Sequence, residues 1–226
     1  MTARVPSEGR SYAWFTWACH AALLAVAAWF WSIGKQRAAE GTLLALLGCL
    51  ALILPPRERM PRLPWRLRAL PRRLDAVPAL ASLLSSPGYG INLFYGANAY
   101  DEVVHLLSGA LAGAVLAALL LADGRPRSLR HMALAGLGGG LLLSLVWEVF
   151  EAVAGLIGNW TDTWTDIALT TGGTALGVLA WHALAGAGTP PAARMPAQVP
   201  GGAAAPPLAP RQQGRRGVGP DPAAGA

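Results

Sequence analysis

The chain has 226 residues, of which 54% are hydrophobic and 13% charged, and it carries a formal net charge of +6. Its mean hydropathy of +0.40 is far from that of soluble proteins, and long apolar runs recur along most of the sequence. These values exclude an ordinary soluble domain and predict an all-α fold, a polytopic helical membrane bundle. The positive charge is mostly arginine placed between apolar runs, which indicates membrane topology rather than nucleic-acid binding.

The first predicted span covers residues 13–33 and follows a polar N-terminal segment, residues 1–12. Two tryptophans lie near each of its ends, as expected where a helix crosses both membrane interfaces. The run is too long for the apolar region of a signal peptide, so we expect it to remain as an anchor. A second, slightly short span covers residues 38–54 and stops at Pro55 and Pro56.

The next segment, residues 57–75, carries seven arginines. We expect it to be a cytoplasmic loop whose arginines, Arg57–Arg73, lie on the anionic headgroups of membrane lipids. A specific site for a phospholipid or a protein partner is the second interpretation. Nucleic acid is not an expected partner, because no nucleic-acid-binding fold or aromatic platform accompanies the charge.

Residues 76–97 are apolar but contain the sequence Ser-Ser-Pro-Gly-Tyr-Gly at 85–90. Proline and glycine disfavour a continuous helix there, so we predict a broken third helix. Irregular backbone at membrane depth is tolerated where it lines a protein cavity. The segment is predicted to cross the membrane, because otherwise two arginine-bearing loops would lie on opposite faces.

Three further spans are predicted over residues 101–121, 132–157 and 162–184, which makes six in a bundle over residues 13–185. From residue 186 to residue 226 the sequence is mainly Ala, Gly, Pro and Arg without periodicity. This composition predicts a disordered tail.

The arginines also predict an orientation. The loops at 55–75 and 122–131 and the tail carry arginines, whereas the loops at 98–100 and 158–161 carry neither Lys nor Arg. The positive-inside rule therefore predicts a multi-pass protein of the inner or plasma membrane with both termini in the cytoplasm. Only Lys35 and Arg37, in a short loop on the other side, disagree.

Ionisable side chains occur in pairs within the last three spans. The pairs, each three or four residues apart, are Asp101 and His105, Glu148 and Glu151, and Asp162 and Asp166. Each pair shares one helix face. Each such group costs about 2.5–3.5 kcal/mol in a membrane, so a compensating role is expected. In the predicted topology all of them lie in the outer half of the bilayer, and small residues at every fourth position favour close packing of the same faces.

The chemistry of these groups leaves several functions open. Carboxylates with one imidazole suit an unspecified divalent metal ion, and buried carboxylates also suit acid/base catalysis. The predicted catalytic residues are Glu148 and Glu151, and the predicted metal ligands are Asp101, His105, Asp162 and Asp166. The favoured interpretation is a metal-assisted or acid/base enzyme acting on a lipid or envelope substrate. The alternatives are an ion or small-solute transporter and a structural or partner-binding membrane module, and helix N-capping alone would account for Asp101 and Asp162.

The motifs Tyr-Asp-x3-His-x3-Gly, Glu-x2-Glu and Asp-x3-Asp before a Gly-rich last helix resemble those of the YjdF-type family of uncharacterised bacterial inner-membrane proteins. The resemblance covers residues 100–177, about a third of the chain. The order of these residues is more distantly similar to that of VanZ-like proteins. The resemblance implies that the three pairs are signature positions, and it implies no particular reaction.

Overall fold

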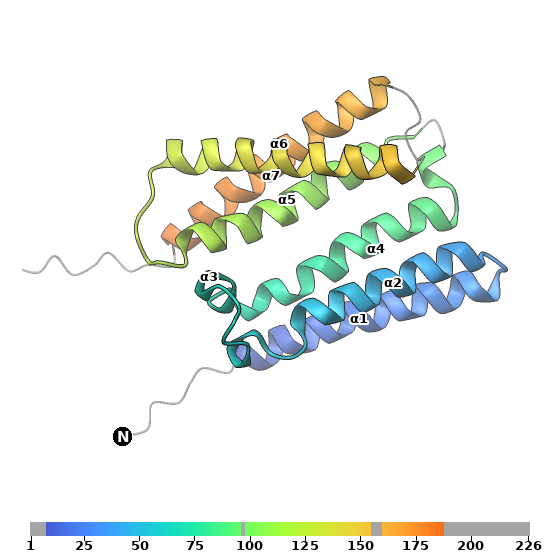
Figure 1. Ribbon diagram of the computed structural model, residues 1–226, viewed down its shortest axis with the longest axis horizontal. Helices are drawn as coiled ribbons and strands as arrows, with labels where there is room; N and C mark the ends of the chain where they lie inside the picture. Colours follow the sequence, from blue (N-terminus) through green and yellow to red (C-terminus); the bar gives the residue numbers. More distant parts are fainter. Residues whose placement is uncertain (1–7, 96–97, 155–159, 188–226) are drawn as a thin grey trace, which may run out of the picture. The chain divides into compact units, whose positions relative to one another are not determined.

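The computed structural model describes residues 8–95, 98–154 and 160–187, and all regular elements in these ranges are helical, as predicted. They are α1 (Glu8–Ser32), α2 (Gln36–Ile53), η1 (Arg57–Arg59), α3 (Trp65–Arg68), η2 (Arg72–Ala76), α4 (Val77–Gly90), η3 (Leu93–Tyr95), α5 (Tyr100–Leu121), α6 (Leu129–Ala154) and α7 (Trp160–Ala187) (Figure 1). The η elements are short 3-10 helices. The predicted tail lies outside the described residues except at 186–187, which continue α7.

Five of the described helices are long and apolar enough to cross a membrane, namely α1 from Ala13 onward, α2, α5, α6 and α7. They fall within a few residues of the predicted spans, because an apolar run of about 20 residues satisfies its own backbone polar groups as a helix. The sixth predicted span is not confirmed. Helix α4 has only 14 residues, which reach about 21 Å, less than the roughly 30 Å of a hydrocarbon core.

The break predicted at residues 85–90 lies elsewhere. Helix α4 runs continuously through Pro87 and ends at Ile91, where the chain turns before η3. Pro87 lies in the last turn of α4, so its missing N–H removes one hydrogen bond near the helix end and the helix continues for a few residues. The amide of Ile91 still donates to the carbonyl of Pro87 at 3.0 Å. The prediction that proline and glycine interrupt this helix at 85–90 was therefore wrong.

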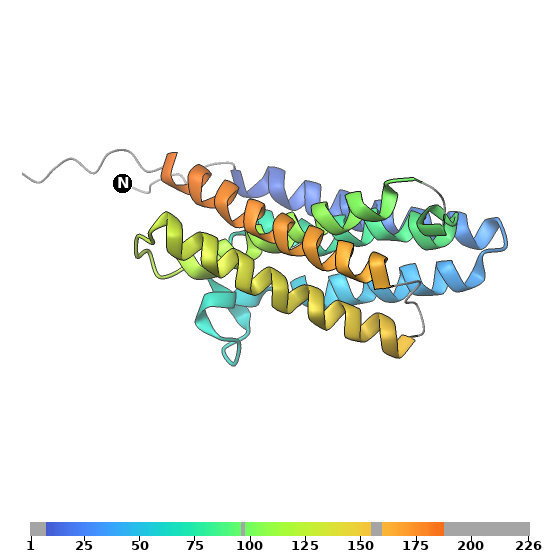
Figure 2. The same cartoon turned by 90° about the horizontal axis from the view of Figure 1, so that it is seen from above.

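The helices pack in two groups. Helix α7 packs most extensively against α5 and then against α6, while α1 packs against α2 and α4. Helix α4 also contacts α5, and the Tyr100 hydroxyl at the start of α5 donates to the Leu84 carbonyl of α4. Figures 1 and 2 show α7 beside α5 and α6 in both views. The three helices that carry the predicted site residues thus form one group.

Glycines bring the backbones of α5, α6 and α7 together. A Cβ on Gly136 of α6 would lie 2.9 Å from the Cα of Ala175, and a Cβ on Gly140 would lie 2.8 Å from the Cα of Thr171. A Cβ on Gly113 of α5 would meet the backbone of α7 as well. These contacts show the close approach that the four-residue spacing of small residues predicts.

Ion pairs gather several arginine-bearing segments at one end of the helices. Arg66 Nη2 lies 2.9 Å from Asp123 Oδ2, and Arg127 Nη2 lies 2.6 Å from the same oxygen. Arg73 lies over the ring of Trp181 near the end of α7, with its Cζ 4.2 Å from the ring centroid. The 54–76 connection, the 122–128 loop and the C-terminal part of α7 therefore meet at this end, which we call the arginine end.

Candidate functional site

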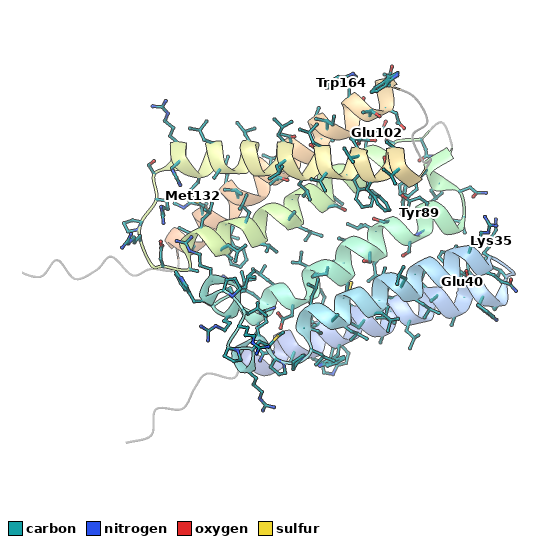
Figure 3. The ribbon with its side chains drawn as sticks, in the orientation of Figure 1. Lys35, Glu40, Tyr89, Glu102, Met132 and Trp164 are labelled. Carbon is teal, nitrogen blue, oxygen red and sulfur yellow. The ribbon has the colours of Figure 1, made fainter. Side chains whose placement is uncertain are left out.

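The predicted site residues come from three helices at the end away from the arginine end. Asp101 and His105 lie in the first two turns of α5, Glu148 and Glu151 in the last two turns of α6, and Asp166 in the second turn of α7. Figure 3 shows Glu102 and Trp164 at this end of α5 and α7, far from Met132 near the start of α6. Antiparallel α5 and α6 and antiparallel α6 and α7 bring these turns to the same level.

The first group of side chains consists of Asp101, His105 and Asp166. Nε2 of His105 lies 3.4 Å from Oδ1 of Asp101 and 3.7 Å from Oδ2 of Asp166. One potential ligand atom from each of the three residues lies within 4.8 Å of the other two. We call this group the histidine trio. Its distances match the spread of donor atoms around one metal ion.

The other ring nitrogen of His105 is held from α7. Nδ1 lies 3.0 Å from Oγ1 of Thr170, and the hydroxyl of Thr174 donates to the Thr170 carbonyl at 2.8 Å. Thr170 and Thr174 are both buried. This contact orients the imidazole so that Nε2 points at the two carboxylates, the arrangement that metal-binding histidines commonly have.

The second group consists of Glu148, Glu151 and Asp166, again with one oxygen from each residue within 4.8 Å of the others. We call it the glutamate trio, and Asp166 belongs to both trios. Oε1 of Glu151 accepts a hydrogen bond from Nε1 of Trp147 at 2.9 Å. Trp147 is a site residue that the sequence analysis missed, although its spacing of four from Glu151 on one helix face is visible in the sequence.

Glu148 is the most unusual side chain of the site. It is 7% exposed, and neither of its carboxylate oxygens has a hydrogen-bond partner within the part of the chain that the structure describes. An ionised carboxylate that is buried without a partner costs several kcal/mol, so such groups are paired, bound to a metal or protonated. The Glu148 carboxylate is therefore in a position that favours a positively charged ligand.

The helices themselves supply almost no cations to balance these acids. Helices α5 and α7 contain no Lys or Arg, and the only such residue of α6 is Arg130, in the first turn at the arginine end. The other basic side chains of these helices, Arg130, His131 and His182, lie toward the arginine end, so His105 is the one basic side chain that α5, α6 and α7 place at the two trios. A bound cation would remove the repulsion between them.

Asp162, a predicted metal ligand, belongs to neither trio. It lies in the first turn of α7 and is exposed, whereas Asp166 one turn later is 4% exposed. Glu102 of α5 is also exposed and outside both trios. The structure thus brings together five of the six predicted residues and leaves Asp162 at the margin of the site.

Polar contacts extend about one turn from the trios toward the middle of the helices. The Ser144 hydroxyl donates to the carbonyl of Leu141 at 3.0 Å, and its oxygen lies 3.5 Å from Oγ1 of Thr171. The next turns are those of Gly140 and Gly136, where the backbones of α6 and α7 touch. The space between the helices is therefore closed beyond Ser144 along this interface.

Aromatic side chains surround the site on the outer surface of the helices. Trp147, Phe150, Trp160 and Trp164 are all exposed large rings near the ends of α6 and α7. Tryptophan is enriched where membrane helices meet the headgroup region. These four rings lie at the same end of α6 and α7 as the two trios.

Comparison with known proteins places the chain in a family. A family model described as predicted membrane protein, DUF2238, matches residues 15–186. The match covers most of the chain, and the chain belongs to this family. No curated protein and no solved structure matches it. The resemblance to the YjdF-type family and the more distant similarity to VanZ-like proteins stay predictions.

Proposed function

We propose that this member of the DUF2238 family binds divalent cations between α5, α6 and α7 and uses them in an enzymatic reaction on a lipid or envelope substrate. The observation that carries the proposal is the Glu148 carboxylate, which is buried and lacks a hydrogen-bond partner while lying beside two further carboxylates. A cation is the ligand that offsets the cost of burying such a group.

The donor atoms narrow the choice of cation. The glutamate trio offers only carboxylate oxygens, which suit Mg²⁺, Mn²⁺ and Ca²⁺. The histidine trio adds one imidazole nitrogen, which also admits Zn²⁺. No cysteine is near either trio, because the only two cysteines, Cys19 and Cys49, lie in α1 and α2. We therefore expect hard or borderline divalent ions and not soft ones.

The proposed enzymatic role follows from where the site opens. A divalent cation held by these residues would polarise a carbonyl or phosphoryl oxygen of the substrate and lower the pKa of a bound water. Glu151 is only half-buried, whereas Glu148 is enclosed, so Glu151 is the carboxylate that an incoming substrate reaches first. The exposed tryptophans around the site suit an amphiphilic substrate whose apolar part stays in the bilayer.

A transporter is the second candidate, and one observation disfavours it. A transported ion needs a polar route that continues through the helices, but among the described residues the Ser144–Thr171 contact is the last side-chain polar contact between α6 and α7 toward the arginine end. Beyond it, the glycines of α6 lie against the backbone of α7 and leave no space at this interface. An enzyme that works at one membrane surface needs no such route.

The test is the metal content of the full chain purified in mild detergent. The parent, Glu148→Gln and Glu102→Gln are compared after incubation with Mg²⁺, Mn²⁺, Zn²⁺ or Ca²⁺ and removal of free metal. We expect at least one cation per chain in the parent and in Glu102→Gln, which alters an exposed acid outside both trios. Glu148→Gln should hold less. A folded parent without any bound cation, or a Glu148→Gln protein with the parent's content, contradicts the proposal.

We also propose that the arginine end faces the cytoplasm, that both termini lie there and that the membrane is the inner or plasma membrane. The supporting observation is that Arg66 and Arg73 of the 54–76 connection and Arg127 of the 122–128 loop lie at the same end of the helices. The exposed side chains of this end include Arg59, Arg62 and Trp65. Arginine side chains in such positions bind the anionic headgroups of membrane lipids. A C-terminal green fluorescent reporter should fluoresce and a C-terminal alkaline phosphatase should be inactive; the opposite pattern contradicts the orientation.

A further inference from the structure

We infer that the site takes two divalent cations, bridged by Asp166, and not one. The inference rests on the proposed cation binding and deepens it. Its starting point is that five potential ligands form two trios rather than one cluster, with Asp166 as the residue common to both. The histidine trio and the glutamate trio would each hold one cation.

The distances between donor atoms support two ions. Oxygen and nitrogen ligands lie about 2.0–2.6 Å from a divalent cation, so two ligands of the same ion are at most about 4–5 Å apart. Each trio meets this limit, because its three donor atoms lie within 4.8 Å of one another. The five residues do not form one such group. One cation would therefore leave either the His105 side or the Glu148 side without a positive partner.

Asp166 contributes a carboxylate oxygen to each of the two trios, which is what a bridging ligand requires. Its Oδ2 lies 3.7 Å from Nε2 of His105, on the side of the histidine trio, and a carboxylate has a second oxygen for a second ion. The residue is 4% exposed, so its orientation is fixed by packing between α5 and α6. Carboxylate-bridged pairs of cations about 3.5–4 Å apart recur in enzymes that cleave phosphate and amide bonds.

The charges of the ligands also favour two cations. The trios contain four carboxylates, Asp101, Glu148, Glu151 and Asp166, and α5 and α7 carry no Lys or Arg. With neutral His105 as a ligand, four ionised carboxylates carry a charge of −4. One divalent cation would leave −2 inside the membrane-spanning helices, whereas two would leave none. With one cation, two of the carboxylates would have to be protonated or stay uncompensated, whereas two cations allow all four to serve as ionised ligands.

Two cations at adjacent sites also define the substrate class more closely. A pair of divalent ions holds the attacking and leaving oxygens of a displacement at phosphorus or a carbonyl. Together with the exposed rings around the site, this favours a phosphate-containing or ester-containing lipid over a substrate that is soluble in water. Trp147, which holds Glu151, lies at the exposed side of the glutamate trio.

Manganese is the probe that tests the number of ions, because Mn²⁺ accepts both the nitrogen-containing and the all-oxygen ligand set. The full chain in detergent is titrated with Mn²⁺, and bound metal is counted while the electron paramagnetic resonance spectrum is recorded. We expect two Mn²⁺ per chain and the spectrum of a magnetically coupled pair. His105→Ala and Glu148→Gln should each retain one ion and give an uncoupled spectrum. Asp166→Asn should lose the coupling and bind both ions at least tenfold more weakly.

The outcomes separate this inference from the cation proposal. One Mn²⁺ per parent chain, or two ions without coupling, overturns the bridged pair and leaves cation binding intact. No bound Mn²⁺, Mg²⁺, Zn²⁺ or Ca²⁺ overturns both. The spectrum of the parent alone decides between one ion and a coupled pair, so the test does not depend on whether a variant folds. Glu102→Gln is the control and should match the parent in both measurements.

Discussion

Nδ1 of His105 lies 3.0 Å from Oγ1 of Thr170, so that α7 fixes the orientation of a ring that α5 carries. The opposite nitrogen, Nε2, faces the carboxylates of Asp101 and Asp166. A cation on Nε2 requires the ring proton to be on Nδ1, from which it is donated to the threonine hydroxyl. Thr170 is therefore a positioning residue for the proposed cation site.

This contact yields the first prediction. Thr170→Val keeps the volume of the side chain but removes the acceptor for the Nδ1 proton. Loss of such a partner typically weakens metal binding by about 10–100-fold, and we expect a loss of this size in a metal titration. Thr170→Ser retains the hydroxyl and should stay close to the parent. Equal affinities in the valine and serine variants would show that the hydroxyl does not orient the ring.

The second prediction separates two aspartates on the same helix. Asp162 is exposed and outside both trios, whereas Asp166 is buried and belongs to both. We expect Asp162→Asn to keep the metal content of the parent and Asp166→Asn to reduce the affinity at least tenfold. The measurement is bound metal per chain at a free concentration near the parent's dissociation constant. A loss in Asp162→Asn as large as that in Asp166→Asn would make Asp162 a ligand, as its sequence pattern predicts.

The third prediction concerns the packing of α6 against α7. A Cβ on Gly140 would lie 2.8 Å from Thr171 Cα and from Thr174 Cβ, whereas a Cβ on Gly138 meets no atom within 4 Å. Gly140→Ala should lower the free energy of unfolding in detergent by about 1–3 kcal/mol, because the helices must separate. Gly138→Ala should be neutral or slightly stabilising, since alanine favours a helix over glycine.

The two glycines are two residues apart on one helix, so each variant controls for the other. Both changes add one methyl group to α6, and they differ in what that methyl group meets. A Gly138→Ala protein that is destabilised as much as Gly140→Ala would show that contact of the added methyl group with α7 is not the cause of the loss.

Spacing along single helices predicted part of the site. Asp101 and His105 are four residues apart and do lie in contact, because i and i+4 share a helix face. The same rule applied to Asp162 and Asp166 without distinguishing them. Which of the two is buried depends on where α7 begins and where it meets α5 and α6, and no pattern within one helix contains this information.

The sequence also could not predict that the buried Glu148 carboxylate lacks a hydrogen-bond partner, or that Asp166 belongs to both trios. Both depend on how three helices cross, which is set by contacts such as that of Gly140 with Thr171. Pro87 shows a different limit. Its presence predicts a helix break, but the effect of a proline depends on its distance from the helix end. Here only one turn of α4 follows, and the break lies beyond Gly90.

The last prediction concerns Asp123, which joins two arginine-bearing segments outside the membrane-spanning helices. The backbone N–H of Arg125 donates to Oδ1 at 3.1 Å, and the guanidinium groups of Arg127 and Arg66 lie at Oδ2. The Arg125 hydrogen bond first, and then the charges of Arg127 and Arg66, hold the pKa of Asp123 below its usual value of 3.8. The ionised carboxylate is therefore favoured in the folded chain.

A lowered pKa in the folded state links the stability of the arginine end to pH. The contribution of Asp123 is fully present above about pH 4, where the unfolded chain is also ionised, and it is lost as the pH falls through the lower folded pKa. Asp123→Asn mimics the protonated side chain. We expect its thermal unfolding midpoint to lie a few degrees below that of the parent at about pH 6, and the two midpoints to converge as the pH falls through the lowered pKa of Asp123. Other carboxylates titrate in both proteins, so only the difference between them reports on Asp123. A difference that stays constant over this range would mean that the Arg66 and Arg127 contacts stabilise the fold through packing and not through the charge of Asp123.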